Sequence, residues 1–453
     1  MPDPFQSAFE QHREKILAQW MELLAFPSIS TDPAHHHDCL ACAEWEVQHL
    51  RAMGFDNARL LPTPGNPVVF AERQGLPGKP VVLFYGHYDV QPVDPLEAWH
   101  TPPFAPTLID GRMRARGAQD NKGQHFYALK AIETLIQQNA LGATLKILIE
   151  GEEECGSHGI AAAMPNWRDL LKADLLLVTD IGMDGPRAPT ITLSLRGMLH
   201  LTAELSGPVR DLHSGTHGGV APNPAIGLAR MIASLHNPDG SIAIPGYTDG
   251  IQPPTPDELE MIRAMPFDAA AYRKATGVPP TGGERARPVS ERLGLRPTIE
   301  VNGFRSGFDG PGVKTIIPAL ARVKFTSRLA AGQDPARCLA ALETHLRQHT
   351  PEGLTLTITE KGVGGSGFRL NPKSPWVTRA TSVLQNLYGV APIRRWEGAS
   401  IPIIAELAKI SGAEPLLVGF GLEEDSIHAP NESFALDQFR NGYLYVAHLL
   451  AGL

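Results

Sequence analysis

The sequence predicts an α/β fold with two domains: a larger domain whose mostly parallel central sheet is flanked by helices, and an inserted smaller α+β domain. The chain has 453 residues, more than the ~100–200 residues of an ordinary domain. Up to about residue 180, short apolar runs alternate with helical patterns, which favours a sheet covered by helices. From residue 190 the strands alternate apolar and polar residues, as strands with one solvated face do.

The elements follow in chain order. The larger domain is predicted to contain a helix over 5–26, a helix over 38–53, strands over 67–70 and 81–85, a helix over 122–139, and strands over 144–150 and 175–180. The smaller domain is predicted to contain strands over 190–205, 297–302, 320–329 and 354–360, with a helix over 222–236. After a Gly-rich linker at 362–367, a helix over 374–388 and a buried strand over 414–420 complete the larger domain. The larger domain therefore covers 1–186 and 368–453, and the insert covers 187–367.

Composition excludes several classes of partner. A net charge of -8 gives no basic surface for neutralising phosphates, so we expect a small-molecule substrate and no nucleic acid. No apolar run approaches the ~20 residues that span a bilayer, and the charged N-terminal segment lacks the apolar core of a secretion signal. With four cysteines and no such signal, we expect a cytoplasmic protein with reduced thiols and no membrane association.

The first candidate site residues lie in GlyHisTyrAspValGlnPro at 86–92, directly after the predicted strand at 81–85. Ligands collect at the carboxyl ends of strands in open α/β sheets. In an extended segment His87 and Asp89 face the same side, so Asp89 can orient a metal-binding imidazole of His87. A structural His–Asp pair without a ligand explains the same pattern.

Carboxylates in two further segments are open to two interpretations. Asp120, in ArgGlyAlaGlnAspAsnLysGly at 116–123, precedes a helix and fits either an N-cap or a carboxylate that bridges two metal ions. GluGlyGluGluGluCysGlySer at 150–157 gathers several carboxylates, Glu153 and Glu154 among them, after a buried strand. An acidic run is usually a solvated loop, but a cation would favour the ionised forms of carboxylates at a sheet end.

Two more candidates complete the set. Asp180 closes the apolar strand at 175–180, and His428 follows the strand at 414–420 within AspSerIleHisAlaProAsnGlu at 425–432. Together with His87, Asp120 and Glu154 they make two imidazoles and three carboxylates, without a thiolate. Such a set suits a hydrolytic pair of zinc, manganese or cobalt ions better than a structural zinc site.

These motifs and their order resemble the M20 family of metallopeptidases, most closely its dipeptidase branch, over essentially the whole chain. The resemblance implies two divalent metal ions per subunit, zinc in the first place, with manganese or cobalt as alternatives. One ion would be held by His87 and Asp180 and the other by Glu154 and His428, with Asp120 bridging them. The insert would be a lid or dimerisation domain beside a catalytic domain.

The resemblance also implies catalytic roles. Glu153, counted by its distance from GlySer at 156–157, would be the general base acting on a metal-bridged water, although Glu152 makes the alignment of the pair ambiguous. His213, in AspLeuHisSerGly at 211–215, matches a histidine that dipeptidases supply from the opposite subunit to stabilise the oxyanion. A homodimer joined through the insert is therefore expected.

Three residues match substrate contacts of the family: Thr315, Arg328 and Ser400. A planar guanidinium suits a free α-carboxylate because it binds both oxygens at once. The residues alone fit a surface ion pair for Arg328 equally well, and a loop histidine such as His213 is more often simply solvated.

The predicted function is a di-metal dipeptidase or short-peptide exopeptidase acting on substrates with a free carboxylate. An amidohydrolase of the same family that removes N-acyl or N-carbamoyl groups from amino acids is the nearest alternative. A non-catalytic binding protein of the same fold is the remote one. We expect the Pro- and Gly-rich stretch at 237–296 to determine the substrate side chains preferred.

Overall fold

The computed structural model describes residues 3–265, 267–398, 401 and 403–453. The chain forms two compact units. Unit 1 consists of Met1–Leu193, Leu370–Arg395 and Ile403–Leu453, and unit 2 consists of Ser194–Arg369 and Trp396–Pro402. The chain enters unit 2 a few residues later than the boundary expected from the sequence.

Unit 1 is built on one large sheet. Its helices and strands are α1 (Pro4–Leu24), α2 (His36–Ala52), β1 (Arg59–Leu61), β2 (Val68–Arg73), β3 (Val81–His87), β4 (Thr107–Ile109), β5 (Arg112–Arg114), α3 (Lys122–Gln137), β6 (Thr144–Glu150), α4 (His158–Ala163), α5 (Arg168–Leu171), β7 (Leu175–Val178), β8 (Thr190–Leu195), α12 (Pro375–Tyr388), β16 (Ile393–Trp396), α13 (Ile404–Ser411), β17 (Glu414–Leu417), β18 (Ser433–Ala435) and α14 (Leu436–Leu450), where β8 and β16 end inside unit 2. Over the described residues the strand order is β1-β2-β6-β3-β7-β17-β8-β15, where β15 is Phe368–Arg369 of unit 2, with β16 beside β8. The inner strands β6, β3, β7 and β17 run parallel.

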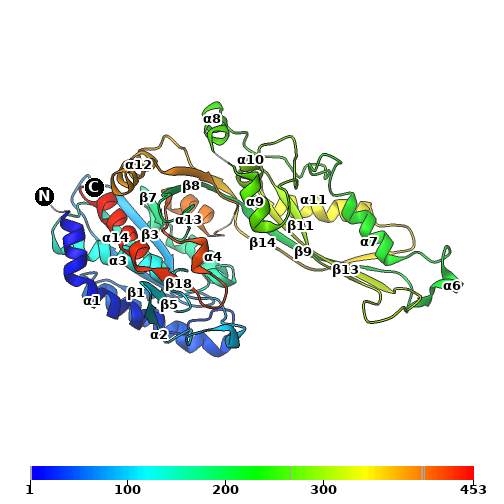
Figure 1. Cartoon of the computed structure of the whole chain (residues 1–453), viewed down its shortest axis with the longest axis horizontal. Coiled ribbons are helices and arrows are strands. Elements are labelled where there is room, and N and C mark those ends of the chain that lie inside the picture. The colour runs from blue at the N-terminus through cyan, green and yellow to red at the C-terminus, as the bar shows by residue number, and fades with distance from the viewer. Residues whose placement is uncertain (1–2, 266, 399–400, 402) are drawn as a thin grey trace. The chain divides into compact units, whose positions relative to one another are not determined.

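The inner strands are almost wholly apolar because helices cover the sheet. Every residue of β7 is buried. Helix α3 packs against α1 and α14 (Figure 1). Trp20 of α1 is fully buried, with its ring centroid 4.5 Å from that of Phe439 in α14. The predicted α/β class with a mostly parallel central sheet is confirmed, and the sheet is a rigid support for whatever follows its strands.

The prediction of a single strand over 190–205 is wrong. The chain forms two strands here, β8 and β9 (Gly197–Ser206), which are interrupted at Arg196 and belong to different sheets. All of β8 is buried, including its Thr and Ser residues, so its alternating pattern reflects small polar side chains in a covered sheet. An added Cβ at Gly197 would lie 2.7 Å from the carbonyl oxygen of Gly365, so the two backbones approach closely at the break.

Unit 2 contains a smaller antiparallel sheet. Its elements are β9, β10 (Leu212–His213), α6 (Ser214–His217), α7 (Pro224–Ala233), α8 (Pro256–Ala264), α9 (Ala269–Thr276), α10 (Val289–Gly294), β11 (Thr298–Ser306), β12 (Ile316–Ile317), β13 (Leu320–Leu329), α11 (Pro335–Gln348), β14 (Thr355–Val363) and β15 (Phe368–Arg369). The main sheet has the order β11-β13-β9-β14, and β10 pairs with β12. Figure 1 shows α7 and α11 along this sheet.

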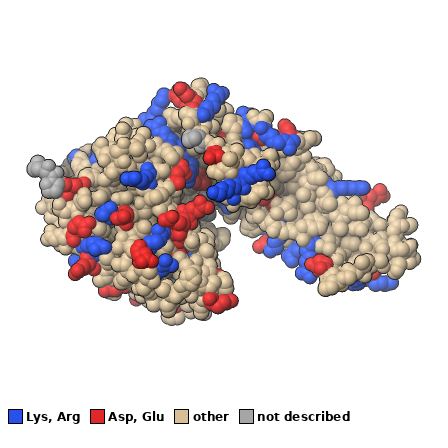
Figure 2. Space-filling view, viewed as in Figure 1, with Lys and Arg blue, Asp and Glu red and all other residues tan. Residues whose placement is uncertain are grey.

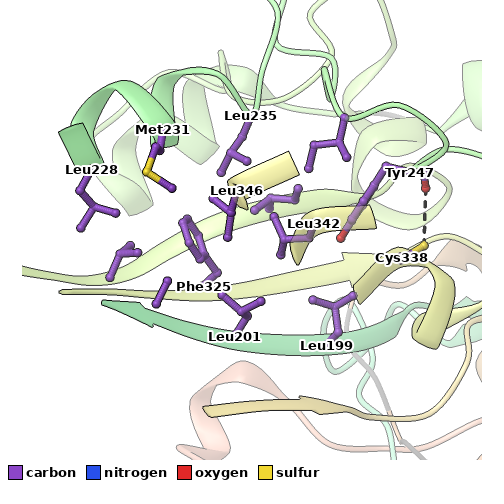
Figure 3. Packing of buried hydrophobic residues seen from close by; sticks show 14 of the residues in the cluster. Leu199, Leu201, Leu228, Met231, Leu235, Tyr247, Phe325, Cys338, Leu342 and Leu346 are labelled. Atoms are coloured by element: carbon purple, nitrogen blue, oxygen red, sulfur yellow. Dashed lines mark hydrogen bonds between the residues drawn. The ribbon is translucent and has the colours of Figure 1, made fainter. Parts of the chain in front are cut away.

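The core of unit 2 lies between its sheet and these two helices. Figure 3 shows Phe325 of β13 and Leu201 of β9 pointing toward Leu228 of α7 and Leu342 of α11, all of them buried. Alternate residues of β13, such as Arg322 and Lys324, point to the opposite, exposed face. The sheet is therefore covered on one face only, as the alternating sequence predicts.

No helix among the described residues is both long and apolar enough to cross a membrane. On the face of unit 1 visible in Figure 2, acidic and basic side chains are interspersed. In unit 2 the stretch 237–296 folds into the short helices α8, α9 and α10, and Arg296 forms an ion pair with Glu284 at 2.7 Å. Its expected part in substrate preference stays a prediction.

Candidate metal centre

The parallel register of the inner strands gathers the candidate ligands. His87 is the last residue of β3, and Tyr85 of β3 pairs with Val178 at the end of β7. Asp180 follows Val178 by two residues, so it comes level with His87. An added Cβ at Gly86 would lie 2.7 Å from the Cβ of His125, so only glycine lets β3 approach α3 this closely. The ends of neighbouring parallel strands thus deliver side chains to one place.

His87, Asp120 and Asp180 form the first group of potential ligand atoms, all within 4.8 Å of one another. His87 Nε2 lies 3.2 Å from Asp120 Oδ1 and 3.6 Å from Asp180 Oδ2. On the other side of the ring, Nδ1 lies 3.0 Å from the carbonyl oxygen of Asp89 and 3.3 Å from its Oδ1. Asp89 thus lies where it can orient the imidazole, which leaves Nε2 facing the two carboxylates.

Asp120, Glu154 and His428 form the second group. His428 Nε2 lies 2.9 Å from Asp120 Oδ2 and 3.4 Å from Glu154 Oε2. One oxygen of Asp120 therefore faces His87 and the other faces His428. A single carboxylate belongs to both groups, as bridging requires.

The buried carboxylates of the site favour a bound cation. Burial and the charge of Asp120 raise the pKa of Glu154 to about 10, and burial raises the pKa of Asp180. Burial alone would lower the pKa of His87, but the charge of Asp180 raises it well above its ordinary value. His87 Nε2 is buried without a hydrogen-bond partner among the described residues. Imidazole and carboxylate donors around such an atom fit a divalent metal ion, which favours ionised carboxylates.

The acidic run at 150–154 separates into different environments. Burial raises the pKa of Glu153 well above its ordinary value, and its carboxyl lies within electrostatic reach of His87, Asp180 and Asp120 without being a member of either group. Glu152 instead accepts a hydrogen bond from the Gly159 backbone N–H at 2.7 Å. Glu153 thus lies beside the two groups, Glu154 belongs to the second group, and Glu152 holds the backbone at Gly159 through a hydrogen bond.

Amide side chains that the sequence interpretation missed hold two of the carboxylates. Gln91 Nε2 donates to Glu154 Oε2 at 2.7 Å, and Asn121 Nδ2 donates to Asp180 Oδ1 at 2.9 Å. The carboxylate of Asp89 also accepts from the backbone N–H groups of Glu153 and Glu154 at 3.2 and 3.0 Å. Gln91 and Asn121 lie inside the motifs at 86–92 and 116–123, and this position could have identified them from the sequence.

The candidate substrate residues of unit 2 lie at two places. His213 pairs with Ile316 across β10 and β12, and the Ser214 N–H donates to the Thr315 carbonyl at 3.0 Å, so His213 and Thr315 are neighbours. Both are exposed. Arg328 lies near the other end of β13, half-buried, opposite Met198 of β9. Ser400 lies outside the described residues.

Comparisons with known proteins agree with this arrangement. The sequence model of "Peptidase family M20/M25/M40" matches residues 83–452. The Beta-Ala-His dipeptidase of Homo sapiens is 30% identical over 448 residues, covering 93% of this chain and 86% of that protein. A Cys-Gly metallodipeptidase of Candida albicans is 27% identical over 466 residues, covering 97% and 94%.

A solved structure shows the same fold. The M20 family metallo-carboxypeptidase Sso-CP2 from Sulfolobus solfataricus has a TM-score of 0.84 at 30% identity and covers 96% of this chain and 98% of its own. The resemblance inferred from the motifs is thereby confirmed. The chain belongs to Peptidase family M20/M25/M40 and is an enzyme of the metallopeptidase class.

Proposed function

We propose that this enzyme is a di-metal dipeptidase or short-peptide exopeptidase that hydrolyses amide bonds in substrates with a free carboxylate. The observation that carries the proposal is the position of Asp120, whose two oxygens face His87 and His428 in two separate ligand groups. The names of the relatives support it, since two are dipeptidases and a third is a carboxypeptidase. None of these names indicates deacylation.

The metal ions would be held as the motifs imply. His87 and Asp180 would hold one, Glu154 and His428 the other, and Asp120 would contact both. Zinc fits this nitrogen and oxygen set, with manganese or cobalt as alternatives. When bound, a pair of divalent cations supplies Lewis acidity that activates water and polarises an amide carbonyl.

Glu153 is the proposed general base. Its carboxyl lies within electrostatic reach of His87, Asp180 and Asp120 of the ligand groups, and it belongs to neither group. It would take a proton from the attacking water and pass it to the leaving amine nitrogen. Asp89 fixes the backbone of this turn through the N–H groups of Glu153 and Glu154.

The spacing of the proposed substrate contacts in unit 2 supports the proposal of a homodimer. His213 and Thr315 lie past the end of the sheet where Ser206 pairs with Leu320, and Figure 1 shows the adjoining α6 at the tip of unit 2. Arg328 is eight residues along β13 from Leu320, about 26 Å at the ~3.3 Å rise of a strand residue.

A dipeptide spans only about 7 Å when extended. One copy of unit 2 therefore cannot place His213 and Arg328 on the same dipeptide. In the proposed dimer, Arg328 of one copy and His213 and Thr315 of the other would contact the same substrate, with Arg328 on its carboxylate.

The proposed function is tested by removing divalent ions with a chelator, restoring Zn²⁺, Mn²⁺ or Co²⁺ separately, and assaying dipeptides beside N-acyl and N-carbamoyl amino acids. We expect metal-dependent release of amino acids from dipeptides. Activity on the N-acyl panel alone would establish the deacylase alternative, and no activity on either panel would contradict both. The expected cytoplasmic location is checked separately by cell fractionation.

A further inference from the structure

A buried carboxylate outside both ligand groups joins the two segments that carry Asp120 and His428. Glu432 follows His428 by four residues and is fully buried. Its Oε2 accepts hydrogen bonds from Arg116 Nη1 at 2.8 Å and from the Gly117 N–H at 2.9 Å. Its Oε1 accepts from the N–H groups of Gln119 and Asp120 at 3.0 and 3.1 Å. Four donors from one short segment therefore converge on this single side chain.

Further contacts hold the guanidinium of Arg116 that pairs with Glu432, although its buried Nε has no hydrogen-bond partner among the described residues. Arg116 is 1% exposed, its Nη2 donates to the Pro92 carbonyl at 2.9 Å, and its guanidinium lies 5.3 Å from the ring centroid of Trp99. The backbone carbonyl of Glu432 also accepts from the Ala115 N–H at 3.2 Å. A buried ion pair of this kind is costly to break, because the partner left behind stays charged and buried.

The loop that carries His428 requires such fastening. His428 and Asn431 have positive φ angles of 60° and 67°, which side chains with a Cβ rarely adopt unless the surroundings hold them. Asn431 Oδ1 accepts from the His100 N–H at 2.7 Å, which supports the loop from outside the ligand groups. Glu432 supports it from the inside, through the backbone of Asp120.

We propose that Glu432, with Arg116, is a positioning residue of the metal centre, which fixes Asp120 so that its carboxylate serves both ligand groups at once. This inference rests on the proposed metal site. It distinguishes Glu432 from Asn121, whose amide holds Asp180 of the first group only. Loss of Glu432 weakens both metal sites, whereas loss of Asn121 weakens one.

The test is the equilibrium metal affinity of the full-length protein, measured by competition with a chromogenic Zn²⁺ chelator. Glu432→Gln keeps the shape but turns an amide NH₂ toward one pair of donors, so we expect the affinity of both sites to fall about 10–100-fold. Asn121→Ala should lower the affinity of one site by a similar factor. Glu424→Gln is the matched control, because this side chain on the same loop is 65% exposed, and it should bind zinc like the wild type.

A second variant covers the case in which Glu432→Gln does not fold. Glu432→Asp keeps the charge but is one methylene shorter, so it loses part of the set of donors and should show a smaller fall at both sites. Wild-type affinity in the folded variants, even with a lower melting temperature, would overturn the positioning role and leave the metal centre standing. A wild-type chain that binds no divalent cation would overturn the metal centre itself, and this inference with it.

Discussion

The candidate functional residues of the two units differ in their exposure and in how firmly neighbouring side chains hold them. In unit 1 His87, Glu154 and Asp180 follow inner strands that are buried on both faces, and Gln91 and Asn121 hold the two carboxylates. His428, with a side chain that is 51% exposed, is the accessible member of the set. In unit 2 the sheet is covered on one face, and His213 and Thr315 stand exposed. His213 accepts a hydrogen bond from the N–H of Gly215, within its own turn.

We interpret this difference as a division between residues for catalysis and residues for substrate recognition. A site that must hold charges close together needs fixed neighbours, because buried carboxylates repel one another and their positions determine what they bind. Residues that meet a substrate or a second copy of the chain have to stay accessible until then. Changes in unit 1 should therefore act on metal binding or on kcat, and changes in unit 2 on the binding of substrate, except at His213, which is proposed to act on the oxyanion.

The largest expected effect is that of Glu153→Gln in unit 1. Because the proposed base is removed without touching a ligand group, kcat should fall by about 10²–10⁴ while metal content stays unchanged. Steady-state kinetics and elemental analysis of the same sample measure both. Glu152→Gln, one residue away, is the control and should retain activity; an active Glu153→Gln would disprove the assignment of the base.

The next largest effect is expected for His213 of unit 2, whose removal should lower kcat. If His213 stabilises the oxyanion of a second copy, His213→Ala should lower kcat by about 10²–10³ without loss of metal. Mixing inactive His213→Ala and Glu153→Gln proteins, followed by subunit exchange, should restore part of the activity, because some active sites then have both residues intact. If the mixture gains no activity, the site is closed within one chain.

A smaller effect is expected for Arg328→Ala. A hydrogen bond to a charged group contributes about 1.5–3 kcal/mol, so KM for dipeptides should rise about 10–100-fold. Arg328→Lys should recover part of this loss, since the charge returns without the planar fork. The wild type and Arg328→Ala should hydrolyse dipeptides with an amidated C-terminus equally well. If Arg328→Ala still has the higher KM for these substrates, Arg328 binds something other than the carboxylate.

The smallest expected effect is on the pH dependence of the free energy of unfolding, to which buried histidines of the two units contribute differently. Burial lowers the pKa of His49 in unit 1 to about 3, whereas the unfolded chain protonates it near pH 6.5. Between these values the unfolded state binds more protons, so the free energy of unfolding falls as pH falls, by at most about 1.4 kcal/mol per pH unit. His49→Phe should reduce this slope in denaturant unfolding curves. His345→Phe in unit 2 should change it less, and an unchanged slope in His49→Phe would contradict the prediction.

The fold could be predicted from the sequence where a pattern has one structural meaning. The runs at 81–85 and 144–150 are buried parallel strands, β3 and β6, as expected. Helix α14 was not predicted, although most of its residues are buried and its apolar residues Phe439, Tyr443 and Val446 keep a helical spacing. The break at Arg196 was missed because it depends on the close approach of Gly197 to Gly365, far along the chain.

The candidate site divides in the same way. His87, Asp120, Glu154, Asp180 and His428 could be selected because each lies in a motif after a strand or before a helix, and the structure brings them into two groups that share Asp120. Glu432 lies in one of these motifs and was still not selected. Its role depends on hydrogen bonds to the segment Gly117–Asp120, more than three hundred residues earlier. Contacts of this length leave no periodicity or spacing in a sequence.

We propose that two metal ions share Asp120 at the carboxyl ends of the inner strands of unit 1. The most direct test is a crystal structure of the zinc-loaded enzyme with anomalous scattering recorded at the zinc edge. We predict two anomalous peaks per chain, one contacting His87, Asp120 and Asp180 and the other contacting Asp120, Glu154 and His428. A single peak, or two peaks that do not both contact Asp120, would contradict the claim.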